Sequence, residues 1–179
     1  MKYLISILTI VCLVVVPLAG CQRQASPPTA PTNQTGNLDV DRAGFLLADE
    51  PAGGETVIVV REDAENDDDV VVIGRIGGGA NPWIEGRAAF SIVDPSLKAC
   101  SDIPGDMCEK PWDYCCETEL LPSAMALVKV VDDDGKTVEI DARRLLNVKE
   151  LSTVVVKGRA QRDDSGNLTV LATGVFVKK

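Results

Sequence analysis

The stretch that decides the fold is Asp69-Val-Val-Val-Ile-Gly-Arg-Ile-Gly77. It is the clearest strand signal in the chain, because β-branched side chains pack well on a pleated sheet. Gly74 inside the run predicts a bulge or a bend, and the glycines that follow Ile76 end the strand. The sequence therefore predicts a long, glycine-bent β-strand followed by a glycine-rich turn.

Other short β-rich runs, separated by turn residues, occur on both sides of this strand. The sequence predicts strands over residues 45–48, 56–60, 87–94, 124–131, 137–141, 153–160 and 168–177. The strand at 56–60 has an alternative, because Glu50-Pro51 ahead of it could equally open a helix. Asp134-Gly135 predicts a hairpin turn, and residues 142–151 are the best candidate for a short helix.

Apart from the possible lead-in strand 45–48 and the ambiguous run 56–60, about six strands with one short helix before the last hairpin predict an all-β domain built as a Greek-key small barrel. The order resembles the OB-fold in the bent strand 70–77, the strand 90–94 and the terminal pair 154–159 and 170–175. The resemblance covers roughly 110 residues and implies a small closed barrel. OB-folds bind oligonucleotides, oligosaccharides, metals or proteins, so this resemblance implies no single function.

The N-terminus has the parts of an export signal. Lys2 supplies a positive start, and Leu4–Val16 is an apolar run that ends at Pro17. This run of about 13 residues is too short to span a bilayer, which needs about 20. Leu18-Ala19-Gly20-Cys21 then resembles the bacterial lipobox. The resemblance implies a lipoprotein that is cleaved before Cys21 and carries diacylglycerol on the Cys21 thiol.

The chain is therefore predicted to have three parts. Residues 1–20 are the signal peptide, residues 21–44 a disordered tether, and residues 45–179 the domain. The tether is polar and proline-rich and has little to bury. Gln22 stands where lipoproteins retained in an inner membrane typically have aspartate. The predicted location is the cell envelope, with a lipid anchor in a membrane facing the periplasm and, from Gln22, in the outer membrane.

The mature chain is acidic and lacks histidine. The net charge of −9 becomes −10 when the signal takes Lys2 away. Such a domain repels nucleic acid, whose binding depends on Lys and Arg displacing counterions. The absence of histidine excludes Ser-His-Asp and Cys-His catalysis and the usual catalytic zinc and copper sites. The sequence therefore predicts a protein that is not an enzyme, and it nominates no catalytic residue.

Residues 95–117, here called the cysteine-rich loop, contain Cys100, Cys108, Cys115 and Cys116. In an oxidising periplasm this cluster predicts two disulfides that join Cys100 and Cys108 to Cys115 and Cys116 in one of two ways. The alternative is a thiolate site for zinc or another soft metal. The spacing C-x7-C-x6-C-C lacks the C-x2-C knuckles of common zinc sites, and the compartment favours disulfides.

Three aromatic residues in or near this loop are possible recognition residues. Trp112 and Tyr114 lie inside the loop, and Trp83 follows the glycine run. Aromatic side chains anchor protein and sugar interfaces, but a lone tryptophan is more often packed on a core. The stretch from Gly86 to Cys116 also resembles uncharacterised lipoproteins of planctomycete-type bacteria, which implies a compartment and no activity.

Two functions follow from these observations. The first is a non-enzymatic, membrane-anchored binding or scaffolding domain, without a cofactor, for an envelope protein or a glycan. Its partner would meet residues 77–86 and the cysteine-rich loop, since inter-strand loops rim the usual binding face of an OB barrel. The alternative is a metal-handling protein that binds zinc or another soft metal through the four loop cysteines.

Overall fold

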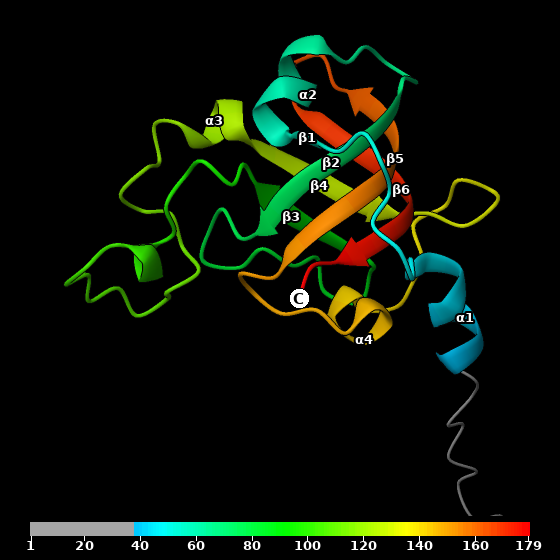
Figure 1. Cartoon of the computed structure of the whole chain (residues 1–179), viewed down its shortest axis with the longest axis horizontal. Coiled ribbons are helices and arrows are strands. Elements are labelled where there is room, and N and C mark those ends of the chain that lie inside the picture. The colour runs from blue at the N-terminus through cyan, green and yellow to red at the C-terminus, as the bar shows by residue number, and fades with distance from the viewer. Residues whose placement is uncertain (1–37) are drawn as a thin grey trace, which may run out of the picture. The chain divides into compact units, whose positions relative to one another are not determined.

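The computed structural model describes residues 38–179 (Figure 1). The predicted signal peptide, Cys21 and the tether up to residue 37 lie outside these residues. Among residues 38–179, no helix is both long and apolar enough to cross a lipid bilayer. The described elements, in chain order, are α1 (Leu38–Phe45), β1 (Glu55–Thr56), α2 (Val57–Asp63), β2 (Asp69–Ile76), β3 (Ala89–Val93), the 3-10 turn η1 (Cys100–Asp102), α3 (Leu121–Ala124), β4 (Met125–Val130), α4 (Ala142–Leu146), β5 (Thr153–Arg162) and β6 (Leu168–Val177).

One six-stranded sheet organises these residues, in the order β1-β2-β3-β4-β6-β5. β2 pairs antiparallel with β3 at one end and with β5 along most of its length. β4 and β6 are parallel, whereas β3–β4 and β5–β6 are antiparallel. The predicted β-rich class is therefore confirmed, with the helices short and placed at the ends and sides of the sheet (Figure 1).

Burial follows the period of two expected for strands with one face on a core. β4 buries Ala126, Val128 and Val130 in alternation. Fully burying a valine side chain contributes about 1.5–3 kcal/mol, so this alternation fixes which face of each strand points inward. A second, smaller cluster places Val93 and Tyr114 together with Leu97, Ala99 and Ala124. This second cluster lies beneath the cysteine-rich loop and holds it against the sheet.

The short helix predicted within 142–151 is confirmed as α4. Asp141 caps its N-terminus by accepting a hydrogen bond from the backbone N–H of Arg143 at 2.9 Å. Asn147 ends it in the left-handed conformation, with φ of 54°, which asparagine adopts more readily than most residues. The predicted turn after β4 is also confirmed, because Gly135 has φ of 76° and donates its N–H to the carbonyl of Asp132.

The predicted strand at 56–60 is wrong, and the helical alternative is correct. Only Glu55 and Thr56 pair as a strand, and the chain then turns into α2. Val57 and Val60, three positions apart on one helix face, are both buried in the main core. Tertiary burial of this face therefore outweighs the strand propensity of the β-branched run.

Other details also differ from the prediction. The last residues of the expected tether form α1, so Phe45 ends a helix and Leu46 makes only a single bridge to Val175. Residues 137–141 form no strand beyond one bridge between Thr137 and Val131. Of the bulge or bend predicted at Gly74, the bulge is not found, since the β2–β5 register runs through it unbroken. Gly74 instead allows Ile92 to approach, because a Cβ there would lie 2.9 Å from the Ile92 side chain.

Candidate functional site

The cysteine-rich loop connects β3 to β4 and begins at a buried carboxylate. Asp94 accepts hydrogen bonds from the backbone N–H of Ile58 at 2.8 Å and from the N–H and hydroxyl of Ser96 at 3.0 and 2.7 Å. Burial opposes the ionisation of Asp94, but these donors outweigh it and hold the pKa of Asp94 below its usual value. Asp94 therefore ties α2 to the start of the loop as a charged group.

Backbone hydrogen bonds join the two halves of the loop. The N–H of Cys100 donates to the carbonyl of Asp113 at 2.8 Å, and the N–H of Ser101 donates to Pro111 at 3.0 Å. These two bonds bring the segment that follows Ala99 against the segment that precedes Cys115. They are the local reason that cysteines fifteen positions apart meet.

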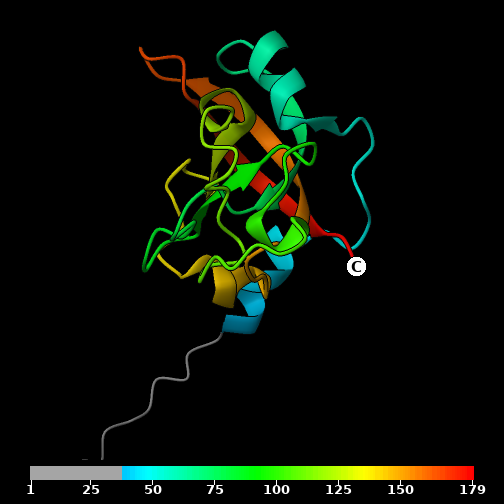
Figure 2. The same cartoon turned by 90° about the vertical axis from the view of Figure 1, so that its left-hand side faces the viewer.

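The folded loop is then docked on the end of β2. Tyr114 is fully buried, and its ring packs so closely on Gly77 that a Cβ there would lie 2.7 Å from the Tyr114 Cε2 atom. Arg75 in β2 forms a two-pronged ion pair with Asp102, whose carboxylate has its pKa lowered chiefly by that hydrogen bond. Trp112 donates its indole N–H to the carbonyl of Ala80 at 3.3 Å. Figure 2 views the molecule from this side.

Three sulfur atoms meet inside the docked loop. The Sγ atoms of Cys100, Cys108 and Cys115, here called the sulfur cluster, all lie within 4.8 Å of one another. The closest pair is Cys100 and Cys115, at 3.3 Å. Cys116 is outside the cluster, with its Sγ 4.0 Å from that of Cys115. Cys100 is buried, Cys108 is half-buried, and Cys115 and Cys116 are exposed.

The surroundings of Cys100 keep its thiol protonated. Burial, followed by the neighbouring thiol of Cys115, raises the pKa of Cys100 to about 12, although the backbone N–H of Cys115 acts in the opposite direction. The loop carries the acids Asp102, Asp106, Glu109, Asp113 and Glu117 against only two lysines. A thiolate, which is the nucleophilic form of cysteine, is therefore disfavoured here unless a cation binds. The buried Cys100 thiol is therefore a poor nucleophile in this loop.

The arrangement bears on the two interpretations of the cysteines. Within residues 38–179 all four cysteines are free thiols, so the disulfides stay a prediction. The cluster contains one pair from each of the two predicted arrangements, Cys100 with Cys115 and Cys108 with Cys115. Ligand sulfurs about 2.3 Å from one metal ion are separated by about 3.8 Å. The sulfur–sulfur distances in the cluster, from 3.3 Å for Cys100 and Cys115 to at most 4.8 Å, are close to this separation. Three sulfurs converging on one point are more than a disulfide needs and are what a thiolate metal site needs.

Two of the three aromatic residues considered for recognition are buried. Tyr114 lies under the loop, as described, and Trp83 is 5% exposed. The Trp83 indole N–H donates to Glu150 at 2.7 Å, and the guanidinium of Arg143 lies 5.4 Å from the ring centroid. Trp112 alone is partly accessible. Among residues 38–179, the structure therefore brings three of the four cysteines together, with Cys116 beside them, and leaves only Trp112 of the three aromatic residues partly accessible to a partner.

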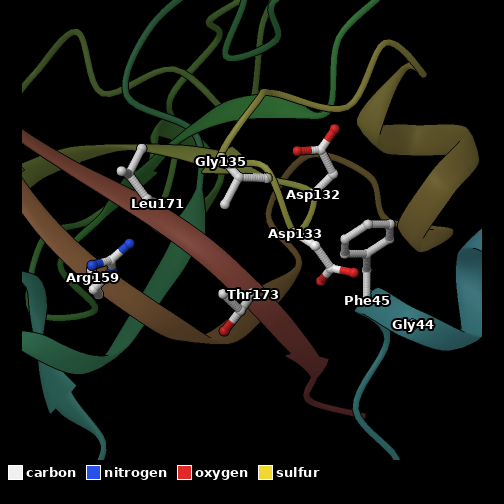
Figure 3. A pocket seen from close by; sticks show the side chains of 9 residues that line it. Gly44, Phe45, Asp132, Asp133, Gly135, Arg159, Leu171 and Thr173 are labelled. Atoms are coloured by element: carbon white, nitrogen blue, oxygen red, sulfur yellow. The ribbon is translucent and has the colours of Figure 1, made fainter.

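The sequence did not point to a surface pocket of about 490 Å³ near α1 (Figure 3). Phe45, Asp132 and Asp133 line it together with Arg159 and Thr173 on the last two strands. These residues come from four segments of the chain, and no sequence motif joins them. All but Phe45 are exposed, so water competes with any ligand for their charges. Arg75 and Asp102, which position the loop, were missed for the same reason, since only folding brings them together.

The sequence matches no protein-family model and no curated protein. The chemistry of the loop itself therefore carries the functional proposal.

Proposed function

We propose that this protein is a non-enzymatic, lipid-anchored envelope protein whose domain binds a soft metal ion through the thiolates of the sulfur cluster. The observation that carries the proposal is the convergence of Cys100, Cys108 and Cys115 within 4.8 Å. Soft thiolate ligands select soft ions such as Cu⁺ and Zn²⁺ over the harder Mg²⁺ and Ca²⁺. A bound cation would also favour loss of the proton from Cys100, which burial disfavours.

The domain that presents the loop is proposed to be an OB-like closed barrel. The strand pairings support this, because they run from β2 through β3, β4, β6 and β5 back to β2. The parallel pairing of β4 with β6 and the position of α4 between β4 and β5 also agree with the order of an OB-fold. In that arrangement the cysteine-rich loop is an inter-strand loop at the barrel rim, where OB-folds usually bind ligands.

The lipid anchor at Cys21 is proposed from the lipobox resemblance. In Figure 1 the cysteine-rich loop projects on the side of the sheet away from α1, the first described element, which the last residues of the predicted tether form. α1 contacts α4 through the hydrogen bond from Arg42 Nε to the carbonyl of Leu145, at 3.2 Å.

Recognition of a protein or glycan through aromatic side chains has less support. Aromatic anchors must expose their rings to a partner before binding. Tyr114 and Trp83 are buried and serve the packing of the loop and the sheet. The metal-binding alternative drawn from the sequence is therefore the function that the geometry supports best.

The test is a titration of the purified, reduced full-length protein with Cd²⁺ in the absence of oxygen. Binding should give one ion per chain and the ultraviolet absorption of cadmium–thiolate bonds. Cys115→Ser, at an exposed position, removes one ligand without disturbing the core and should weaken binding about tenfold or more. Met107→Leu is the matched control, because Met107 is 93% exposed and lies outside the sulfur cluster.

The competing outcome is two disulfides in the protein as isolated. Trypsin releases all four loop cysteines in one peptide, 99–129, because the bond between Lys110 and Pro111 resists cleavage. If this peptide lacks four hydrogens and takes up no alkylating agent, the loop is a disulfide knot and the metal proposal fails. A reduced protein that binds neither Cd²⁺ nor Cu⁺ also refutes it.

A further inference from the structure

We infer that the ion is cuprous copper, held by Cys100, Cys108 and Cys115 in a three-coordinate site, and that Cys116 is the ligand through which it leaves for a thiol-bearing partner. This inference rests on the proposed function. It adds the identity of the ion and a route by which the ion moves.

The number of converging sulfurs favours Cu⁺ over Zn²⁺. Structural zinc is almost always four-coordinate, and only three sulfurs meet here. No carboxylate joins the group of three sulfurs, and Asp106 is already engaged, since it accepts the N–H of Cys108 at 2.7 Å and its other oxygen lies 3.9 Å from the sulfur of Cys116. Monovalent copper is soft and is satisfied by thiolates alone. The site therefore has the ligand type and number that suit Cu⁺.

The burial of the four cysteines forms a gradient from the core to solvent. Cys100 is 2% exposed and is tied by its backbone to Asp113. Cys115 is exposed, and the sulfur of Cys116 is a further 4.0 Å away from it, also exposed. An ion held by Cys100, Cys108 and Cys115 therefore has a free thiol beside it on the solvent side only. Cys116 is the first additional ligand that the ion can reach without the loop opening.

The transfer is a ligand exchange without a change of oxidation state. Cys116 forms a bond to the ion as the bond to buried Cys100 breaks. Thiols of the partner then bind the ion as the bonds to Cys108 and Cys115 break in turn, and the bond to Cys116 breaks last, which leaves the ion on the partner. Each incoming thiol gives up a proton as it binds, and each departing thiolate takes one up. Copper remains Cu⁺ throughout, so no oxidant or reductant takes part.

The experiment compares two adjacent cysteines, each replaced by serine in the full-length protein. The protein is loaded with one Cu⁺ without oxygen and mixed with excess bicinchoninate, a coloured Cu⁺ chelator. We expect Cys116→Ser to keep the equilibrium affinity for Cu⁺ within about threefold and to slow transfer about tenfold or more. Cys115→Ser should weaken the affinity itself. X-ray absorption of the loaded protein should show three sulfur neighbours.

Three results would separate the possible failures. Transfer from Cys116→Ser at the unmodified rate overturns the route. A loss of affinity in Cys116→Ser as large as that in Cys115→Ser, or four sulfur neighbours, overturns the three-coordinate site. Both results leave the proposed function intact, because the protein still binds a soft ion. Absence of binding for Cd²⁺ and Cu⁺ alike overturns the proposed function instead.

Discussion

Replacing Gly77 by alanine should loosen the cysteine-rich loop from the sheet. A Cβ at this position would lie 2.7 Å from Cε2 of Tyr114 and 3.0 Å from the backbone oxygen of Trp112. Neither neighbour has room to retreat, because Tyr114 is fully buried and the second contact is with backbone. The added methyl group must therefore push the loop and the end of β2 apart.

The expected cost follows from these contacts. Overpacking of a well-packed region costs about 1–3 kcal/mol. If the loop relieves the clash by opening locally, this cost multiplies the opened population about 5- to 150-fold. Gly79→Ala is the matched control, since a Cβ at Gly79 meets nothing within 4 Å and neither glycine has a positive φ. The control should therefore leave the loop as it is.

The assay is alkylation of the reduced, native protein, followed by mass spectrometry of the tryptic peptide 99–129. Cys100 is 2% exposed, so it reacts only when the loop opens. Its rate should rise in Gly77→Ala and stay unchanged in Gly79→Ala. Cys116, already exposed, is the internal reference within the same peptide. Equal Cys100 rates in the two variants would refute the proposed docking of Tyr114 on Gly77.

Three further predictions concern the scaffold that holds the loop. Burial opposes ionisation of Asp94, but its hydrogen-bond donors outweigh burial and lower its pKa. The contribution of Asp94 to folding stability is therefore complete above about pH 4 and is lost as the pH falls through the lower pKa of the folded state. Asp94→Asn should lower the free energy of unfolding by about 1–3 kcal/mol near neutral pH, and urea titrations should show this loss shrinking as the pH is lowered. A loss that does not change with pH contradicts the prediction, and Asp133→Asn, at an exposed position, is the control. Gly158→Ala should destabilise the protein by at least about 3 kcal/mol, because its Cβ would lie 2.2 Å from the carbonyl oxygen of Leu171. A melting temperature equal to that of the unmodified protein would contradict this prediction. Tyr114→Phe should retain or raise stability by about 1 kcal/mol, since the buried Tyr114 hydroxyl has no partner among residues 38–179; a clear loss would reveal a hydrogen bond.

Much of the sheet was predictable because its strands carry strong local signals. β2 and β6 were predicted almost to the residue, since both are rich in β-branched residues and bounded by turn residues. α2 was not, because its valines favour a strand locally and become helical only when Val57 and Val60 are buried by the rest of the fold. The position of the β-bulge could not be predicted for a similar reason. Gly158 and not Gly74 marks the register shift, which depends on how β6 pairs with β5.

The candidate site was predictable in composition and not in geometry. The density of cysteines in residues 95–117 identified the loop from sequence alone. Which sulfurs meet depends on the pairing of Cys100 with Asp113 and on the ion pair between Arg75 and Asp102. These partners are distant in sequence, and no spacing rule links them. The burial of Tyr114 likewise follows from its packing on Gly77.

The way the loop is held bears on whether its cysteines are structural staples. Clustered disulfides are expected where a segment lacks a core of its own. This loop has a small core around Tyr114, two cross-loop backbone hydrogen bonds from Cys100 and Ser101, and the ion pair of Asp102 with Arg75. None of these contacts requires a bond between sulfurs. The same Cys100 and Cys115 sulfurs would serve either a disulfide or an ion, so the two states exclude each other. A loop that is already ordered by other contacts leaves its thiols available for the ion, and this is the physical reason to favour the metal site.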